Sequence, residues 1–100
     1  MKVEVLYVPG CANYEAAVQR VRKVLSAQDM QADLCEIVVN SEEQARQLKF
    51  PGSPTIRIDG EDIEPSHQVG LACRLYSNLT GVPSEDSVRS ALARTRKGPA

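Results

Sequence analysis

One hundred residues are enough for one domain with a single hydrophobic core, and we expect residues 1–100 to form it. Hydrophobic residues make up 42% and charged residues 25%, a balance that excludes a disordered chain. A net charge of −1 gives no basic field for nucleic acid, and no apolar run approaches the roughly 18 residues of a membrane-spanning helix. A strand-like segment starts at Lys2 and leaves no room for a signal peptide, so we expect a cytoplasmic protein.

Strand and helix patterns alternate along the first half of the chain. Residues 2–8 are rich in Val, Leu and Tyr, which is typical of a strand, and Pro9-Gly10 ends it. From residue 13 to residue 28, apolar residues recur at helical spacing opposite a polar face. Residues 32–39 form a nearly continuous apolar stretch, which predicts a buried parallel strand. Residues 41–48 have the capping-box spacing of a short helix.

The second half of the chain predicts a hairpin and a last helix. Residues 55–58 and 61–64 flank Asp59-Gly60, a strong signal for a two-residue hairpin turn. Ser84 is a helix-capping residue followed by acidic residues, and the basic stretch 94–97 completes that helix. The order β-α-β-α-β-β-α predicts an α/β fold with a mixed central sheet.

Three cysteines at wide spacing, with no CxxC pair, argue against a disulfide framework and against a structural zinc ribbon. Cys35 lies midway along the second predicted strand, where we expect it in the core. Cys11 follows the first strand at the start of the first helix, where free backbone N–H groups and the helix dipole stabilise a thiolate. Such a thiolate is both a nucleophile and a soft-metal ligand, and the alternative is an inert, half-buried cysteine.

Two local features, combined with this element order, resemble the thioredoxin superfamily. One is Cys11 in the loop between the first strand and the first long helix, and the other is Ser53-Pro54-Thr55 at the start of the third strand. The resemblance implies a thioredoxin-like fold with helices on both faces of the sheet, and a cis Pro54 beside the active-site cysteine. It covers residues 1–64 and the last helix, so residues 66–81 are an insertion, either a short helix or an extra strand.

The motif around Cys11 departs from the thioredoxin pattern. It reads Cys11-Ala12-Asn13-Tyr14, so Tyr14 stands where C-x-x-C has its second cysteine. The chain thereby resembles monothiol glutaredoxins, although it has no recognisable glutathione-binding motif, and we expect no cofactor. It also resembles small bacterial thioredoxin-like proteins, some of which are linked by name to alkylmercury lyases.

Cys73 and Tyr14 are the candidate partners of Cys11. Cys73 either resolves a mixed disulfide or supplies a second soft-metal ligand, with the adjacent Arg74 favouring its thiolate, or it is a small buried residue in a turn. Tyr14 lies about one helical turn from Cys11. Its hydroxyl either donates a hydrogen bond to the thiolate or belongs to the first core-facing residue of the helix.

Three further features complete the candidate site and its surroundings. Pro54, if cis, forms a rigid wall beside the thiol and leaves nearby backbone groups free to pair with an extended peptide or ligand. His67, the sole histidine, is a base or metal ligand only if it approaches Cys11, and otherwise a solvated loop residue. The acidic cluster from Asp59 to Glu64 is expected to be a solvated turn that blunts a sheet edge.

These patterns lead to three functional hypotheses. In the first, an intracellular thiol-redox protein exchanges disulfides with a protein or a small molecule through Cys11, with Cys73 as the resolving thiol. In the second, Cys11 and Cys73 bind a soft metal ion or an organomercurial without turnover. In the third, the chain is a thioredoxin-like interaction module without chemistry.

Overall fold

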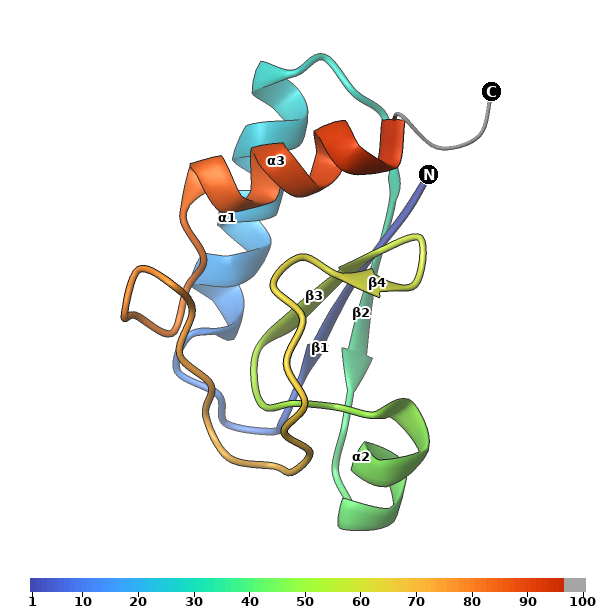
Figure 1. The fold of residues 1–100 in the computed structure, drawn as a ribbon, viewed down its shortest axis with the longest axis vertical. Coiled ribbons are helices and arrows are strands. Elements are labelled where there is room, and N and C mark those ends of the chain that lie inside the picture. Colours follow the sequence, from blue (N-terminus) through green and yellow to red (C-terminus); the bar gives the residue numbers. More distant parts are fainter. Residues whose placement is uncertain (97–100) are drawn as a thin grey trace.

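Strands and helices alternate along the chain in the predicted order. The computed structural model describes residues 1–96, which form a four-stranded sheet and three α-helices (Figure 1). In chain order these elements are β1 (Lys2–Tyr7), α1 (Tyr14–Ala27), β2 (Asp33–Val38), α2 (Glu42–Leu48), β3 (Thr55–Ile58), β4 (Glu61–Asp62) and α3 (Glu85–Arg96). The predicted α/β class is therefore confirmed, and Lys97 of the basic stretch lies outside the described residues.

The sheet is mixed, with the strand order β2-β1-β3-β4. β1 pairs in parallel with β2, from Lys2 opposite Asp33 to Tyr7 opposite Val38. β1 also pairs antiparallel with β3, which in turn pairs antiparallel with β4. The β3–β4 turn is the predicted hairpin: Asp59 and Gly60 have φ values of 49° and 88°, as a type I′ turn requires.

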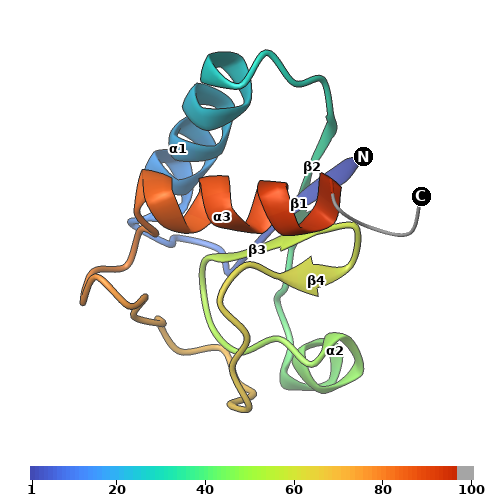
Figure 2. The ribbon, with the colours of Figure 1, turned by 45° about the horizontal axis from the view of Figure 1, so that its top comes forward.

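Helices cover both faces of this sheet. Side chains alternate along a strand, so Val3 and Val5 of β1 face one side, where they pack with the buried faces of α1 and α3. Leu6 faces the other side and packs with Ala45 of α2 and with Phe50, which is fully buried. In Figure 2, α2 accordingly lies apart from α1 and α3.

β2 is more exposed than its sequence predicts. It forms one edge of the sheet, with only β1 as a neighbour, and Val38 is 39% exposed. Cys35 is half-buried rather than a core residue. Because one edge and much of one face of β2 remain uncovered, its apolar run does not mark a central strand.

Helix ends follow the predicted capping residues. The side-chain oxygen of Ser41 accepts a hydrogen bond from the backbone N–H of Gln44 at 3.1 Å, and α2 begins immediately after Ser41. Ser84 does the same for the N–H of Ser87 at 3.0 Å, which sets the start of α3. At the other end of α3, Arg94 donates to the carbonyl oxygen of Ile63 at 3.2 Å.

The connection from β4 to α3 contains neither of the two elements left open for residues 66–81. It runs irregularly past the β1–α1 connection (Figure 1), and its one strand-like contact is an isolated parallel bridge between Cys73 and Ser53. The backbone of Gly81 packs closely on the side chain of Asn13, and a Cβ at Gly81 would clash with the Asn13 Nδ2 atom. No helix in the part of the chain described here is long and apolar enough to cross a membrane.

Candidate functional site

Cys11 lies in the turn between β1 and α1, three residues before the helix begins. Its backbone N–H donates to the carbonyl oxygen of Val8 at 3.2 Å, and its own carbonyl accepts from the N–H of Tyr14 at 3.4 Å. The thiol is half-buried. The N-cap residue Asn13 makes no side-chain hydrogen bond to the first turn, so this helix start keeps free N–H groups near the cysteine.

Ser53 connects this turn to the start of β3. The peptide bond between Ser53 and Pro54 is cis. Ser53 is fully buried, and its side-chain oxygen accepts a hydrogen bond from the backbone N–H of Val8 at 3.1 Å. The residue before the proline is thereby bonded to the residue from which the Cys11 turn begins.

The segment that carries Cys73 meets Ser53 from the other side. The backbone N–H of Ser53 donates to Ala72 at 3.0 Å, and its carbonyl oxygen accepts from the N–H of Arg74 at 3.2 Å. Cys73, opposite Ser53 in this bridge, is exposed, so the alternative of a small buried residue is wrong. The insertion therefore folds back onto the residue that also holds the Cys11 turn.

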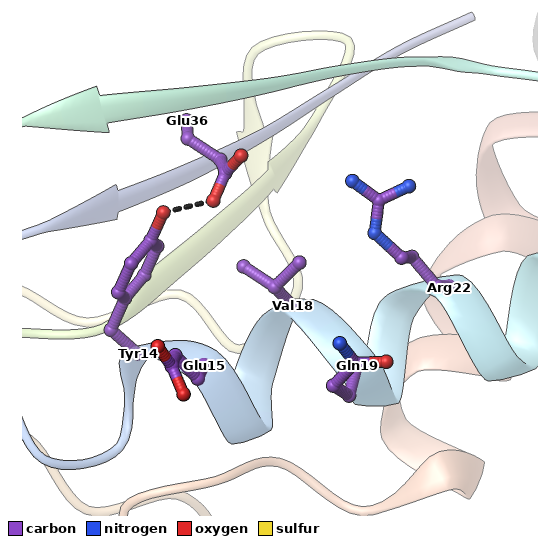
Figure 3. Close-up of a pocket in the computed structure, with 6 residues that line it drawn as sticks. All are labelled: Tyr14, Glu15, Val18, Gln19, Arg22 and Glu36. Carbon is purple, nitrogen blue, oxygen red and sulfur yellow. Dashed lines mark hydrogen bonds between the residues drawn. The ribbon is translucent and has the colours of Figure 1, made fainter.

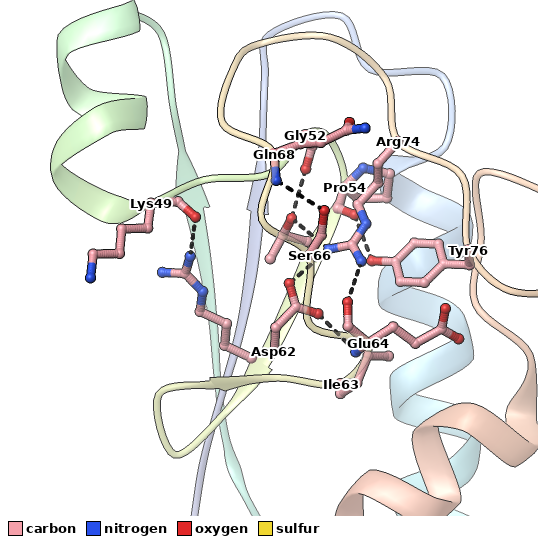
Figure 4. A network of polar contacts seen from close by, with 12 residues as sticks. Lys49, Gly52, Pro54, Asp62, Ile63, Glu64, Ser66, Gln68, Arg74 and Tyr76 are labelled. Carbon is pink, nitrogen blue, oxygen red and sulfur yellow. Dashed lines mark hydrogen bonds and ion pairs between the residues drawn. The ribbon is translucent and has the colours of Figure 1, made fainter.

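Arg74 does not face a thiol, contrary to the expectation that it favours a Cys73 thiolate. Its guanidinium forms an ion pair with Asp62 at 2.8 Å and donates to the backbone carbonyl of Glu64 at 2.7 Å (Figure 4). It also donates to the side-chain oxygen of Thr55 and lies over the Tyr76 ring, 4.3 Å from its centroid. With 6% of its side chain exposed, Arg74 is the buried residue that fixes the insertion to β3 and β4.

Tyr76 joins the segment that carries Cys73 to Pro54. Its ring is buried, and its hydroxyl donates to the carbonyl oxygen of Pro54 at 2.6 Å (Figure 4). Burial raises the pKa of the Tyr76 phenol well above its ordinary value, although the charge of Arg74 opposes that shift. The phenol thus remains a proton donor, and the carbonyl of Pro54 is occupied.

Two members of the acidic cluster are anchors rather than solvated residues, which corrects the expectation from sequence. Asp62 pairs with Arg74, as described above. Glu64 accepts from the backbone N–H of Ser77 at 2.7 Å and from the hydroxyl groups of Ser77 and Ser87. Desolvation raises the pKa of Glu64, but these hydrogen bonds and the charge of Arg74 outweigh it and lower the pKa below its ordinary value of 4.5.

We expect Glu64→Gln to weaken the dependence of stability on pH in the acid range. A carboxyl group with a lowered pKa in the folded state contributes stability that is complete above its unfolded pKa and is lost as the pH falls through the folded pKa. The gap in unfolding free energy between wild type and Glu64→Gln should therefore be widest near neutral pH and narrow below pH 4.5. Urea unfolding at several pH values measures this gap, and a constant gap would contradict the prediction.

One of the two alternatives for Tyr14 was a hydrogen bond from its hydroxyl to the Cys11 thiolate, and the structure does not contain this bond. The Tyr14 hydroxyl donates to the carboxylate of Glu36 on β2 (Figure 3). Its ring stacks on that of Tyr7, with 3.8 Å between the ring centroids. The hydrogen bond to Glu36 raises the pKa of the Tyr14 phenol well above its ordinary value, with smaller contributions from desolvation and Tyr7. The other alternative fits better, because the half-buried Tyr14 packs against the core that contains α1.

A shallow groove of about 400 Å³ runs beside Tyr14, between α1 and β2 (Figure 3). Glu15, Arg22 and Glu36 place both signs of charge along it, and Cys11 is not part of its lining. His67 is exposed in the long connection, as predicted for a solvated loop residue. Within residues 1–96, no group of three or more His, Cys, Asp or Glu side chains is placed to hold a metal ion.

The structure thus gathers part of the predicted site around one residue. Ser53 joins the Cys11 turn, Pro54 and the Cys73 segment, whereas Tyr14 is directed to Glu36. In the sequence, Ser53 stands out only as the neighbour of Pro54. Its role as the residue that holds these segments together depends on tertiary contacts. No protein-family description, curated protein or solved structure matches this chain.

Proposed function

We propose that this chain is a thioredoxin-like thiol–disulfide exchange protein in which Cys11 is the nucleophile and Cys73 the resolving thiol. One observation carries the proposal: buried Ser53 bonds through its side chain to the start of the Cys11 turn, and through its backbone to both neighbours of Cys73. Two thiols far apart in sequence thereby belong to segments that share one anchoring residue.

The arrangement of the sheet supports the thioredoxin-like part of the proposal. The element order is β-α-β-α-β-β-α, and β1 lies between a parallel β2 and an antiparallel β3. The candidate cysteine precedes α1, and a cis proline precedes β3. These are the features on which the sequence resemblance to the superfamily depends.

The proposed chemistry is an exchange of sulfur–sulfur bonds. The Cys11 thiol gives up its proton to solvent, and its sulfur attacks a substrate disulfide to form a mixed disulfide, releasing one substrate thiolate. The Cys73 thiolate then attacks the Cys11 sulfur, which forms a Cys11–Cys73 disulfide and releases the second substrate thiolate. The substrate gains two electrons and the protein loses two, so an external thiol must reduce the protein again. A reducing compartment such as the cytoplasm supplies such thiols.

Binding of a soft metal ion is the second candidate function, and the exposed second thiol favours it. Two thiolates suit linear coordination of Hg(II) or Cu(I), which needs no further protein ligand. The absence of a larger ligand cluster among residues 1–96 fits such a two-thiol site better than it fits zinc. In this reading Cys11 and Cys73 hold a cargo and exchange no disulfide.

We expect glutathione disulfide to form a mixed disulfide at Cys11 that persists in Cys73→Ser and is replaced by an internal disulfide in wild type. Intact-mass spectrometry of the full chain after short incubation follows both species, and peptide mapping locates the adduct. Cys11→Ser should lose the adduct, whereas Cys35→Ser, which removes the other half-buried thiol, should behave as wild type.

Three outcomes separate the hypotheses. A Cys11–Cys73 disulfide in wild type supports exchange. A stoichiometric Hg(II) adduct that is lost in Cys11→Ser and in Cys73→Ser, without any mixed disulfide, supports metal binding instead. Equal, slow modification of Cys11 and Cys35 would contradict both and leave an interaction module without thiol chemistry.

A further inference from the structure

The backbone around the proposed thiol site is already paired with the protein's own chain. Both hydrogen-bonding groups of Cys11 are engaged, its N–H with Val8 and its carbonyl with the N–H of Tyr14. Both groups of Ser53 are engaged by Ala72 and Arg74. Proline has no N–H, and the carbonyl of Pro54 accepts from the hydroxyl of Tyr76. The backbone groups expected to be free beside the proline are therefore occupied.

Residues 72–76, which bond to the backbone of Ser53 and Pro54, are held firmly in place. Arg74 is buried in its ion pair with Asp62, and Tyr76 is 2% exposed. On the other side the fit is close, because a Cβ at Gly52 would lie 2.9 Å from both the Ala72 carbonyl oxygen and the Arg74 Cβ. Figure 4 shows these anchors converging from β4 and from the segment before β3.

The lack of free backbone groups around Cys11 affects which class of disulfide can approach it. An extended polypeptide that adds to a sheet edge obtains its affinity from unpaired main-chain N–H and C=O groups. Cys11, Ser53 and Pro54 have no unpaired N–H, and each of their carbonyls already accepts a hydrogen bond. A small disulfide needs no such pairing to bring its sulfur to a thiolate.

Resting on the proposed function, we infer that the Cys11 site exchanges preferentially with low-molecular-weight disulfides and disfavours disulfides carried on extended polypeptides. Residues 72–76 take the place that a peptide strand would need. The sulfur chemistry is the exchange already described: Cys11 forms the mixed disulfide with one half of the small disulfide, and the other half leaves as its thiolate. The same segment presents Cys73 as the thiol that displaces the first half.

The test compares two disulfides on full-length Cys73→Ser, in which the Cys11 adduct persists. One is glutathione disulfide, and the other is the symmetrical disulfide of an unstructured peptide of about ten residues with a central cysteine. Each rate of adduct formation, read by intact mass, is divided by the rate of the same disulfide with N-acetylcysteine, which removes its intrinsic reactivity. We expect the normalised rate for glutathione disulfide to exceed that for the peptide about tenfold, the equivalent of 1.4 kcal/mol.

Variants of the anchors test whether residues 72–76 cause this preference. Removing the Tyr76 hydroxyl with Tyr76→Phe frees the Pro54 carbonyl while keeping the ring, and it should lower the preference about threefold, as expected from one hydrogen bond. Arg74→Met, which loosens the whole segment, should lower it further. Leu79→Ala is the matched control, because Leu79 lies in the same connection and is 82% exposed. Made in the same Cys73→Ser background as the anchor variants, it should leave the preference unchanged.

Failure of the inference and failure of the proposed function give different results. Equal normalised rates for the two disulfides, with Cys11 reactive toward both, would overturn the inference alone. An unchanged preference in both Tyr76→Phe and Arg74→Met would overturn the assignment to residues 72–76. A Cys11 that reacts with neither disulfide would overturn the proposed function and the inference with it.

Discussion

Replacing Arg74 with methionine is expected to lower the free energy of unfolding by about 3 kcal/mol, because it breaks a buried ion pair on one side only. The Asp62 carboxylate is 12% exposed and loses its charged partner, while the carbonyl of Glu64 and the hydroxyl of Thr55 each lose a donor. Methionine retains an apolar chain of similar length, so the loss reports the polar contacts more than the packing. Equilibrium urea unfolding followed by circular dichroism measures the change.

Arg89→Met is the matched control for this substitution. Arg89 also pairs with an aspartate, Asp86, but on the surface of α3, where its side chain is 46% exposed. Exposed pairs of this kind contribute about 0.5 kcal/mol or less. Equal losses in the two variants would show that burial of the Arg74 pair adds nothing, and would remove the argument that Arg74 fixes residues 72–76.

Most of the fold follows from local patterns in the sequence. The period of apolar residues in residues 13–28, the hairpin turn at Asp59-Gly60 and the capping residue Ser41 each act within a few residues of themselves. The position of β2 at the sheet edge is different, because an apolar run does not say how many neighbours a strand has. That failure placed Cys35 in the core, where it does not lie.

The candidate site shows the same difference between local features, which the sequence predicts, and tertiary contacts, which it does not. The places of Cys11 before α1 and of Pro54 before β3 follow from the order of the elements, whereas their proposed roles come from the resemblance to the thioredoxin superfamily. The partners of Arg74 and Tyr14 were missed because Asp62 and Glu36 are brought to them by tertiary folding, across connections that no local pattern describes. Within the acidic cluster, Asp62 and Glu64 depart from the expectation for the same reason, because Arg74, Ser77 and Ser87 reach them only through tertiary folding.

Gly52→Ala is expected to destabilise the protein by about 3 kcal/mol and to disturb the pairing of Ser53 with residues 72–74. Gly52 has a φ of 132°, a backbone conformation that side-chain-bearing residues rarely adopt. The added Cβ would also lie 2.9 Å from the Ala72 carbonyl oxygen and from the Arg74 Cβ, so the segment that carries Cys73 must move away. Backbone strain and close contact therefore act together at this position.

Gly60→Ala separates these two contributions. Gly60 also has a positive φ, 88°, but a Cβ there would meet no atom within 4 Å, so only the backbone cost of about 1 kcal/mol remains. Urea unfolding of both variants measures the difference, and the normalised disulfide rates measure its effect on the site. If Gly52→Ala is folded at working temperature and admits the peptide disulfide more readily than Gly60→Ala does, contact between Gly52 and residues 72–74 is what keeps the site closed. If the two variants lose the same stability and share the wild-type preference, the close packing at Gly52 does not control the site.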